Sequence, residues 1–123
     1  MAEHNQTGKD GETTAVEYLK NKGYQILHTN WRKGRCELDI VAKTSDELVI
    51  VEVKTRSGTP LETPENAVDR RKIDHIVLAA DLYIKMFDID LPARFDIISI
   101  TGYYPNYIID HIEDAFYPPL KTY

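Results

Sequence analysis

Two stretches of the chain carry charged side chains where apolar ones would be expected. Asp39 stands within the β-branched run Cys36–Lys43, and Glu52 and Lys54 lie at the end of the apolar run that begins at Leu48. The two acids offer the carboxylate oxygens that Mg²⁺ and Mn²⁺ prefer. A lysine beside such a metal can support a nucleophilic water or neutralise the charge that develops on a phosphate. The pattern therefore indicates metal-assisted phosphate chemistry.

The segment between these runs predicts a hairpin that brings the two acids together. A two-residue turn at 45–46 would fix the register of the two strands. This register places Asp39 directly opposite Glu52. It also places Glu37 opposite Lys54, with Glu37 and Asp39 on the same face of their strand. Because like charges opposite each other destabilise a sheet, the pairing of two acids favours a site where a cation lies between them.

Two further charges lie on apolar stripes of expected helices. Glu12 precedes apolar residues by three, four and seven positions, and Lys72 lies four positions from an apolar residue on either side. A single charge of this kind is usually a long stem that lies along the edge of the stripe. Four such charges on three or four separate elements, of the types that complete one metal and phosphate site, favour a functional interpretation.

Hydrophobic periodicity predicts the elements that position these residues. Helices are expected at 7–21 and 65–86, and strands at 24–31, 36–43, 47–55, 94–101 and 107–112. The order is therefore αβββαββ. The long helix allows a crossover between the third and fourth strands, which would make them parallel and the sheet mixed. We expect an α/β fold in which residues 1–123 form one domain.

The charge balance limits how the chain can meet a polyanion. Its 123 residues include 15 Lys and Arg against 20 Asp and Glu, for a net charge of −5. This balance argues against coating of DNA or a membrane by bulk charge. The cations nevertheless cluster at 32–35, 54–56 and 70–72, so a local basic surface is compatible with the sequence. The single cysteine, and the lack of a signal-like start or membrane-length apolar run, predict a cytoplasmic protein with no membrane partner.

The chain resembles the YraN-like family of bacterial proteins. The resemblance spans nearly the whole chain and rests on the ordered runs Gly8–Glu12, Asn30–Arg32, Glu37–Ala42, Val51–Arg56, Ala67–Lys72 and Arg94–Ile97. That family is regarded as related to Holliday junction resolvases and to the wider PD-(D/E)xK nucleases. The resemblance implies a restriction-endonuclease-like fold, in which a mixed five-stranded sheet is flanked by helices in three layers.

The resemblance also implies a function and roles for individual residues. It implies a Mg²⁺- or Mn²⁺-dependent endonuclease acting on DNA, with branched DNA as one candidate substrate and a homodimer by analogy with resolvases. Asp39 and Glu52 would be the metal ligands, Lys54 the catalytic lysine and Glu12 a helix-borne catalytic acid. Phosphate contacts are expected from four cations, namely Arg32, Arg35, Arg56 and Lys72. The chain departs from the family pattern at Cys36, where the family usually has glycine, and a side chain there narrows the approach of a backbone.

Two other interpretations remain open from the residues. The first is a nucleic-acid-binding module that keeps the nuclease fold but has little hydrolytic activity. The second is a structural α/β domain in which Glu12, Asp39, Glu52 and Lys54 form a buried ion network, although such networks are weak evidence for stability. The four histidines show no metal-like spacing to each other or to Cys36 and are interpreted as structural.

Overall fold

The computed structural model describes residues 3–56, 69–103 and 105–117. These ranges contain two helices and five strands in the expected order αβββαββ. The elements are α1 (Glu3–Asn21), β1 (Gln25–Lys33), β2 (Cys36–Lys43), β3 (Leu48–Arg56), α2 (Arg70–Met86), β4 (Ala93–Thr101) and β5 (Ile108–Ile112).

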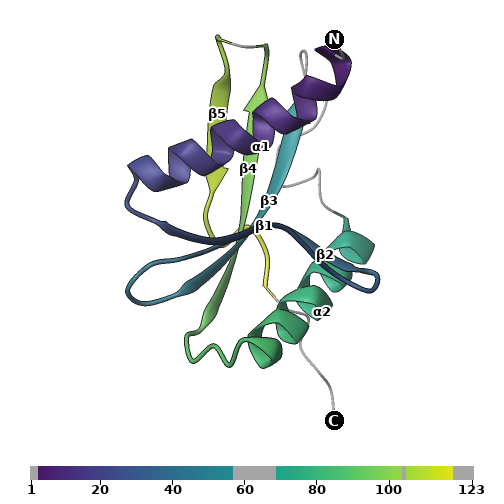
Figure 1. Ribbon diagram of the computed structural model, residues 1–123, viewed down its shortest axis with the longest axis vertical. Coiled ribbons are helices and arrows are strands. Elements are labelled where there is room, and N and C mark those ends of the chain that lie inside the picture. The colour runs from purple at the N-terminus through teal and green to yellow at the C-terminus, as the bar shows by residue number, and fades with distance from the viewer. Residues whose placement is uncertain (1–2, 57–68, 104, 118–123) are drawn as a thin grey trace.

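The five strands form one mixed sheet with the spatial order β1-β2-β3-β4-β5. Every neighbouring pair is antiparallel except β3 and β4, which are parallel and connected through α2. Helix α1 packs on β3, β1 and β4, whereas α2 packs on β2 on the opposite side. The sheet is thus the middle of three layers (Figure 1), and this confirms the expected α/β architecture.

The β2–β3 turn confirms the predicted hairpin register. The amide of Thr44 donates to the carbonyl of Glu47 over 2.9 Å, and the Thr44 hydroxyl accepts from two amides within the turn. From this turn the strands pair in the expected register as far as Ile40 and Val51. The ladder ends there, one residue before Asp39 would meet Glu52.

The predicted pair of Glu37 and Lys54 is wrong. Glu37 instead pairs with Arg32 on β1, and their side chains form an ion pair of 3.2 Å. Beyond the last pair of the β2–β3 ladder, the described backbone pairing of β2 is with β1.

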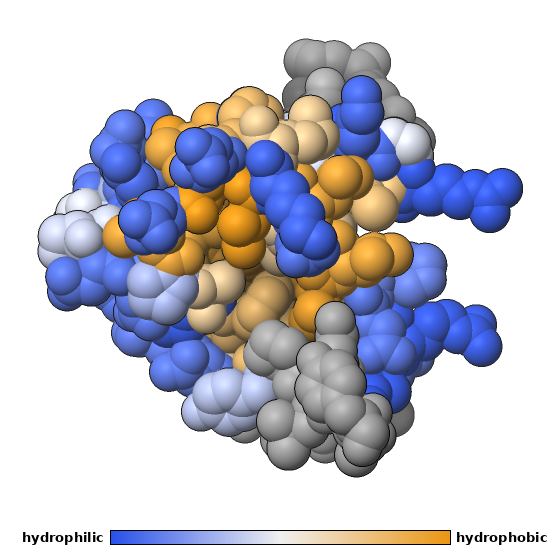
Figure 2. Space-filling view, turned by 90° about the horizontal axis from the view of Figure 1, so that it is seen from below, coloured by the Kyte–Doolittle hydropathy of each residue, from blue (hydrophilic) through white to orange (hydrophobic). Residues whose placement is uncertain are grey.

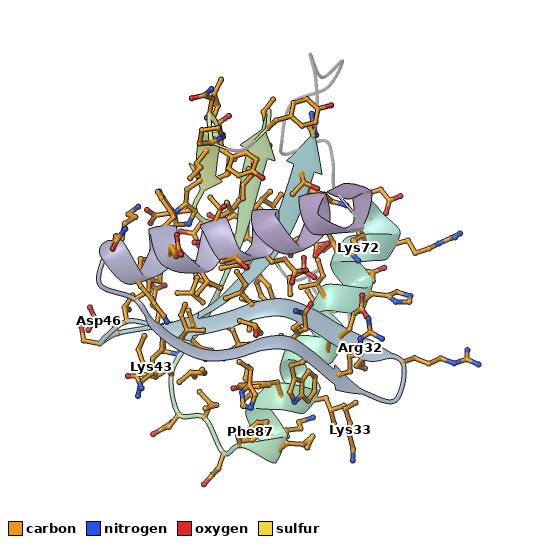
Figure 3. The ribbon with its side chains drawn as sticks, turned by 45° about the horizontal axis from the view of Figure 1, so that its top comes forward. Arg32, Lys33, Lys43, Asp46, Lys72 and Phe87 are labelled. Carbon is orange, nitrogen blue, oxygen red and sulfur yellow. The ribbon has the colours of Figure 1, made fainter. Side chains whose placement is uncertain are left out.

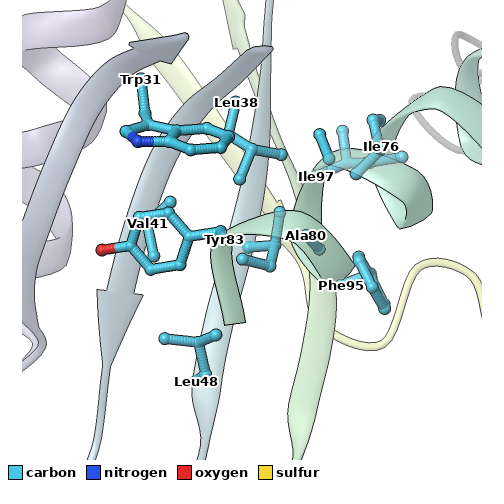
Figure 4. Close-up of a cluster of buried hydrophobic side chains, with 11 residues drawn as sticks. Trp31, Leu38, Val41, Leu48, Ile76, Ala80, Tyr83, Phe95 and Ile97 are labelled. Atoms are coloured by element: carbon cyan, nitrogen blue, oxygen red, sulfur yellow. The ribbon is translucent and has the colours of Figure 1, made fainter. Parts of the chain in front are cut away.

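The core between the sheet and α2 is centred on Tyr83. Its ring is 1% exposed and packs edge-on against Trp31, with 5.2 Å between the ring centroids. Figure 4 shows the surrounding aliphatic side chains from β2, β3, β4 and α2. The Tyr83 hydroxyl lies 2.6 Å from Nδ1 of His28, so the one polar atom of this ring has a partner inside the core.

A second core lies between the sheet and α1. Ala15 and Leu19 are fully buried there against β-branched side chains of the central strands, namely Ile40, Val49, Val51, Ile98 and Ile100. Gly11 lies one helical turn before Ala15, and any β-carbon at this position would clash with the methyl group of Thr55. The glycine therefore lets α1 approach the end of β3 closely.

The start of α2 determines where Lys72 lies. Asp69 adopts an extended conformation and caps the helix, because its side chain accepts a 2.9 Å hydrogen bond from the amide of Lys72. The predicted start at Glu65 lies outside the described residues, and the described helix begins at Arg70. Lys72 is thus in the first turn of α2, close to the end of the sheet where β3 finishes.

Hydrophobic side chains also gather on the outer surface. Figure 2 shows them on the face seen from below, among hydrophilic side chains. On and just after α2, Leu78, Met86 and Phe87 are between 43% and 63% exposed. No helix in the described ranges combines the length and the apolar character that a membrane crossing needs.

Candidate metal and phosphate site

The two predicted acids meet where β2 and β3 separate. The carboxylate of Asp39 accepts a 2.9 Å hydrogen bond from the amide of Val53 on β3, so a side chain takes the place of a ladder bond. Because Glu52 directly precedes Val53, this bond brings Asp39 to the level of Glu52, and the two carboxyl groups interact electrostatically. Glu52 is only 6% exposed and lies on the α2 side of β3, in line with Leu48 and Ile50. Two carboxyl groups from neighbouring strands thus share a largely buried position.

This proximity changes the acidity of Asp39. Burial raises its pKa first, and the interaction with the neighbouring Glu52 carboxyl raises it further, to about 7. The amide of Val53 and the charge of Lys72 act in the opposite direction and only partly compensate. A cation at this position would therefore relieve a repulsion that the fold itself creates.

Lys72 brings such a positive charge to the acid pair. Its Nζ lies 3.3 Å from Oε2 of Glu52, and its side chain remains 41% exposed. Partial burial lowers the pKa of the Lys72 ammonium, but the attraction of Glu52 outweighs it, and the pKa lies above its ordinary value. The predicted inward position of Lys72 on α2 is consistent with this contact.

Basic side chains line two adjacent pockets on this side of the molecule. The first has a volume of about 340 Å³ and is lined by Lys54, Asp69, Arg71, Lys72 and His75. The second, of about 320 Å³, is lined by Arg35, Cys36, Glu37, Lys72, His75, Ile76 and Leu78. Figure 3 shows Lys72 on the same side as Arg32 and Lys33, and away from Lys43 and Asp46. The predicted cations Lys54 and Arg35 each line a pocket together with Lys72, the residue that contacts Glu52.

Three other predicted residues do not line these two pockets. Glu12 lies on α1 and accepts a 2.7 Å hydrogen bond from Asn30, with which it lines a separate pocket of about 470 Å³. Arg32 is ion-paired with Glu37. Arg56 ends β3, and its carbonyl accepts from the amide of Gly102. No described contact joins Glu12 or Arg32 to the acid pair.

Sequence reasoning missed three residues that the fold brings to the site. Asn30 lies on β1 opposite Asp39, because the pairs on either side of it match Thr29 with Ile40 and Trp31 with Leu38. Arg71 and His75 line the basic pockets. His75 follows Lys72 by three positions on a helix, and this spacing was the available signal that both face the same way.

The acid pair fits a divalent metal of the Mg²⁺ type. This ion commonly binds through one or two carboxylates and completes its coordination with waters and substrate phosphates. Within the described ranges, no group of three or more His, Cys, Asp or Glu side chains is arranged to hold a metal. The site accordingly suits an ion that shares its coordination with a substrate, rather than a closed structural site.

A second cluster of charges lies on β4 and β5, away from the acid pair. Arg94 binds Asp96 through two hydrogen bonds of 2.9 and 2.8 Å, and Nε2 of His111 lies 2.7 Å from the same carboxylate. Arg94 also donates to Glu47 and Tyr24. Asp96 is fully buried. Burial raises its pKa, but the hydrogen bonds with His111 and Arg94 outweigh this effect and hold the pKa below its ordinary value. The cluster ties the β2–β3 turn to β4 and β5.

Comparison with known proteins identifies a family. The profile of "Uncharacterised protein family UPF0102" matches residues 11–100. The chain belongs to the UPF0102 family. Three similar members come from Bacteroides thetaiotaomicron, Phocaeicola vulgatus and Flavobacterium psychrophilum, each described as a UPF0102 protein. They are 62%, 52% and 48% identical over 120, 120 and 117 residues, which cover 95–98% of this chain and 98–99% of theirs.

Membership of the UPF0102 family confirms the YraN-like resemblance noted in the sequence. The matched region begins at Gly11 and ends at Ile100. It therefore includes the acid pair, Lys72 and the buried pair of Arg94 and Asp96. The descriptions of the UPF0102 relatives name no activity, ligand or partner.

Proposed function

We propose that this UPF0102 protein is a Mg²⁺- or Mn²⁺-dependent endonuclease that hydrolyses phosphodiester bonds in DNA. The observation that carries the proposal is that Asp39, bound by the Val53 amide, and the buried Glu52, ion-paired with Lys72, lie at the same level of the split between β2 and β3. A sequence selected for stability alone would avoid two acids in this position. The resemblance to relatives of Holliday junction resolvases supports the same activity.

The acidic and basic residues of the site would have separate chemical roles. Asp39 and Glu52 would hold the metal ion, and the amide of Val53 fixes one of the two carboxylates. The ion, when bound, lowers the pKa of a water and stabilises charge on the scissile phosphate. Lys54 lines the adjoining pocket, where its ammonium would neutralise charge on the phosphate oxygens.

Lys72 connects the acid pair with the basic surface. It contacts Glu52 and also lines both basic pockets. Together with Arg35, Arg71 and His75 it would contact phosphates of the DNA backbone. Contacts of this type give affinity without base readout and make binding weaker at higher salt. On a chain with net charge −5, we expect modest, salt-sensitive affinity that a bound metal increases.

A nucleic-acid-binding module without hydrolytic activity is the second candidate. One observation favours it: Lys72 already neutralises Glu52 through a 3.3 Å ion pair, so the acid pair has a charged partner without a metal. In that case the basic pockets would bind DNA, and the carboxylates would only anchor Lys72.

Metal titration and DNA nicking together distinguish the two candidates. The wild type, Asp39→Asn, Lys54→Ala and the control Lys85→Ala would be titrated calorimetrically with Mn²⁺. They would then be incubated with a fluorescently labelled four-way junction and with a linear duplex of the same sequence. Lys85 is an exposed cation paired with Asp81 at the far end of α2. Lys85→Ala changes the net charge by the same amount as Lys54→Ala and therefore controls for charge.

The endonuclease proposal predicts a different result for each variant. Wild type and Lys85→Ala bind Mn²⁺ and nick DNA only with metal. Asp39→Asn loses both properties. Lys54→Ala binds Mn²⁺ but nicks at least about 100-fold more slowly, because charge on the phosphate is no longer neutralised. Equal nicking by wild type and Asp39→Asn would identify a contaminating nuclease, and DNA binding without Mn²⁺ binding would establish the binding module instead.

A further inference from the structure

The ammonium group of Lys72 lies between a carboxylate and a basic surface. Its Nζ is 3.3 Å from Oε2 of Glu52 on β3, in an ion pair. The same side chain, in the first turn of α2 (Figure 3), lines both basic pockets, whose other cations include Lys54, Arg71 and Arg35. Because lysine has a long and flexible stem, its charge can contact either neighbour.

Glu52 depends on a positive partner. Its side chain is only 7% exposed, whereas that of Lys72 is 41% exposed. A nearly buried carboxylate opposes folding unless a positive charge compensates it. In the described structure the ion pair with Lys72 supplies this charge. Since Lys72 is the exposed member of the pair, water and ions reach Glu52 from the side of the ammonium.

A divalent ion on Glu52 would compete with this ammonium. Mg²⁺ binds carboxylate oxygens at about 2.0–2.1 Å, and Glu52 is also the group that Lys72 contacts. The two cations would then lie within roughly a few ångström of each other, where they repel strongly because little water screens them. Metal binding therefore weakens the contact between Lys72 and Glu52.

The Lys72 side chain can leave Glu52 without movement of its helix. The amide of Lys72 donates a 2.9 Å hydrogen bond to the side chain of the N-cap residue Asp69, which fixes the backbone here. One turn further on, Ile76 is 4% exposed and anchors α2 in the core. The side chain of Lys72 already borders the pocket that Lys54 and Arg71 line. Its release from Glu52 would add an uncompensated positive charge to that pocket.

We propose that Lys72 is an exchangeable partner of Glu52: its ammonium leaves this carboxylate for a DNA phosphate in the adjoining pocket when a divalent ion binds the carboxylate. Lys72 thereby couples metal binding to DNA binding. The metal part of this inference rests on the proposed function. The competition between Glu52 and DNA for one ammonium requires neither a metal nor hydrolysis.

Mn²⁺ titration without DNA tests the competition for Glu52. Lys72→Met keeps the apolar part of the side chain and removes its charge. This variant should bind Mn²⁺ at least about fivefold more tightly than wild type in calorimetry, because the ion no longer competes with an ammonium. Lys85→Met makes the same change in the exposed pair with Asp81 and should stay within about twofold of wild type. Equal or weaker Mn²⁺ binding by Lys72→Met would overturn the exchange.

A metal-free measurement tests the release of Lys72 to DNA. Fluorescence anisotropy in EDTA would follow binding of a labelled linear duplex by wild type, Glu52→Gln, Lys72→Met and the double variant. Glu52→Gln has nearly the same shape but no charge to hold the ammonium. It should bind the duplex about 3- to 10-fold more tightly at low salt, and its salt dependence should increase by about one phosphate contact. Lys72→Met should cost at least about threefold more affinity in the Glu52→Gln background than in wild type.

A charge control and the wild-type protein separate the possible outcomes. Asp110→Asn removes one negative charge at an exposed position on β5 and should bind the duplex within about twofold of wild type. Additive effects of Glu52→Gln and Lys72→Met on duplex binding would overturn the proposal, whether or not the protein is a nuclease. Absence of Mn²⁺ binding and nicking in wild type would contradict the endonuclease and the metal part of this inference. The exchange of Lys72 between Glu52 and DNA would then be decided by the metal-free measurement alone.

Discussion

The carboxylate of Asp39 accepts a 2.9 Å hydrogen bond from the amide of Val53, one residue beyond the last pair of the β2–β3 ladder, and so lies at the level of Glu52. Glu52 is nearly buried, and burial is the first cause of the raised pKa of Asp39. Two acids in such a position oppose folding unless a proton, a lysine or a metal ion lies between them. Functional sites commonly contain residues that lower the stability of the folded protein.

Asp39→Asn should stabilise the metal-free protein at pH 8. The amide has nearly the same shape, still accepts from the Val53 amide and removes one of two repelling charges. We expect a gain of about 1 kcal/mol, which corresponds to a rise of about 4 °C in the melting temperature for a chain of this size. Thermal unfolding followed by circular dichroism would measure it.

A matched variant controls for net charge in that experiment. Asp110→Asn changes the same side chain at an exposed position on β5 and should shift the melting temperature by less than about 1 °C. A fall in melting temperature for Asp39→Asn would show that the two carboxyl groups do not repel each other in the folded protein.

Removal of Arg94 should be strongly destabilising. Arg94→Met leaves the fully buried carboxylate of Asp96 without its bidentate partner. Breaking a buried pair on one side typically costs about 3–5 kcal/mol. Urea unfolding would measure the loss, and Lys85→Ala, which breaks an exposed pair with Asp81, should cost less than about 0.5 kcal/mol. Similar losses for the two variants would show that burial adds nothing to the Arg94 pair.

Asp96 should also control stability in acid. Its pKa is lower in the folded protein than in the unfolded chain, so the unfolded chain binds the proton more tightly. Its contribution is therefore fully present above pH 4 and is lost as the pH falls through the lowered pKa of the folded state. Urea unfolding of wild type and Asp96→Asn between pH 2.5 and 7 would test this prediction. The variant should be less stable at pH 7, and the gap should narrow in acid. A constant gap across this range would contradict it.

Gly11→Ala should fail to stabilise α1 although alanine is the better helix former. A β-carbon at position 11 clashes with the Thr55 methyl group, so the helix or that side chain must move. Thr55→Ser removes this methyl group. In the serine background Gly11→Ala should recover up to about 1 kcal/mol of helix propensity. The comparison is a double-mutant cycle measured by urea unfolding, and additive effects would show that α1 and β3 do not approach closely at this point.

Much of the fold follows from local patterns. The helices and strands lie within a few residues of their predicted positions, because apolar periodicity reports directly which side of an element is buried. The two-residue turn fixed the β2–β3 register, and Thr44 and Glu47 pair across it as expected. The alternation of β3 likewise placed Glu52 on the side of Leu48, opposite Val49 and Val51.

The arrangement around the acids required the tertiary structure. Local alternation predicted a regular β2 and a pair of Glu37 with Lys54, but the ladder with β3 ends at Ile40 and Val51, and Leu38 lies in the opposite core from Ile40. The contact between Lys72 and Glu52 joins residues that only the crossover brings together. The sequence by itself determined which residues carry charge into apolar surroundings. Only the packing of separate elements decided which of those charges meet, because the residue pattern of one strand or helix does not show which other elements pack beside it.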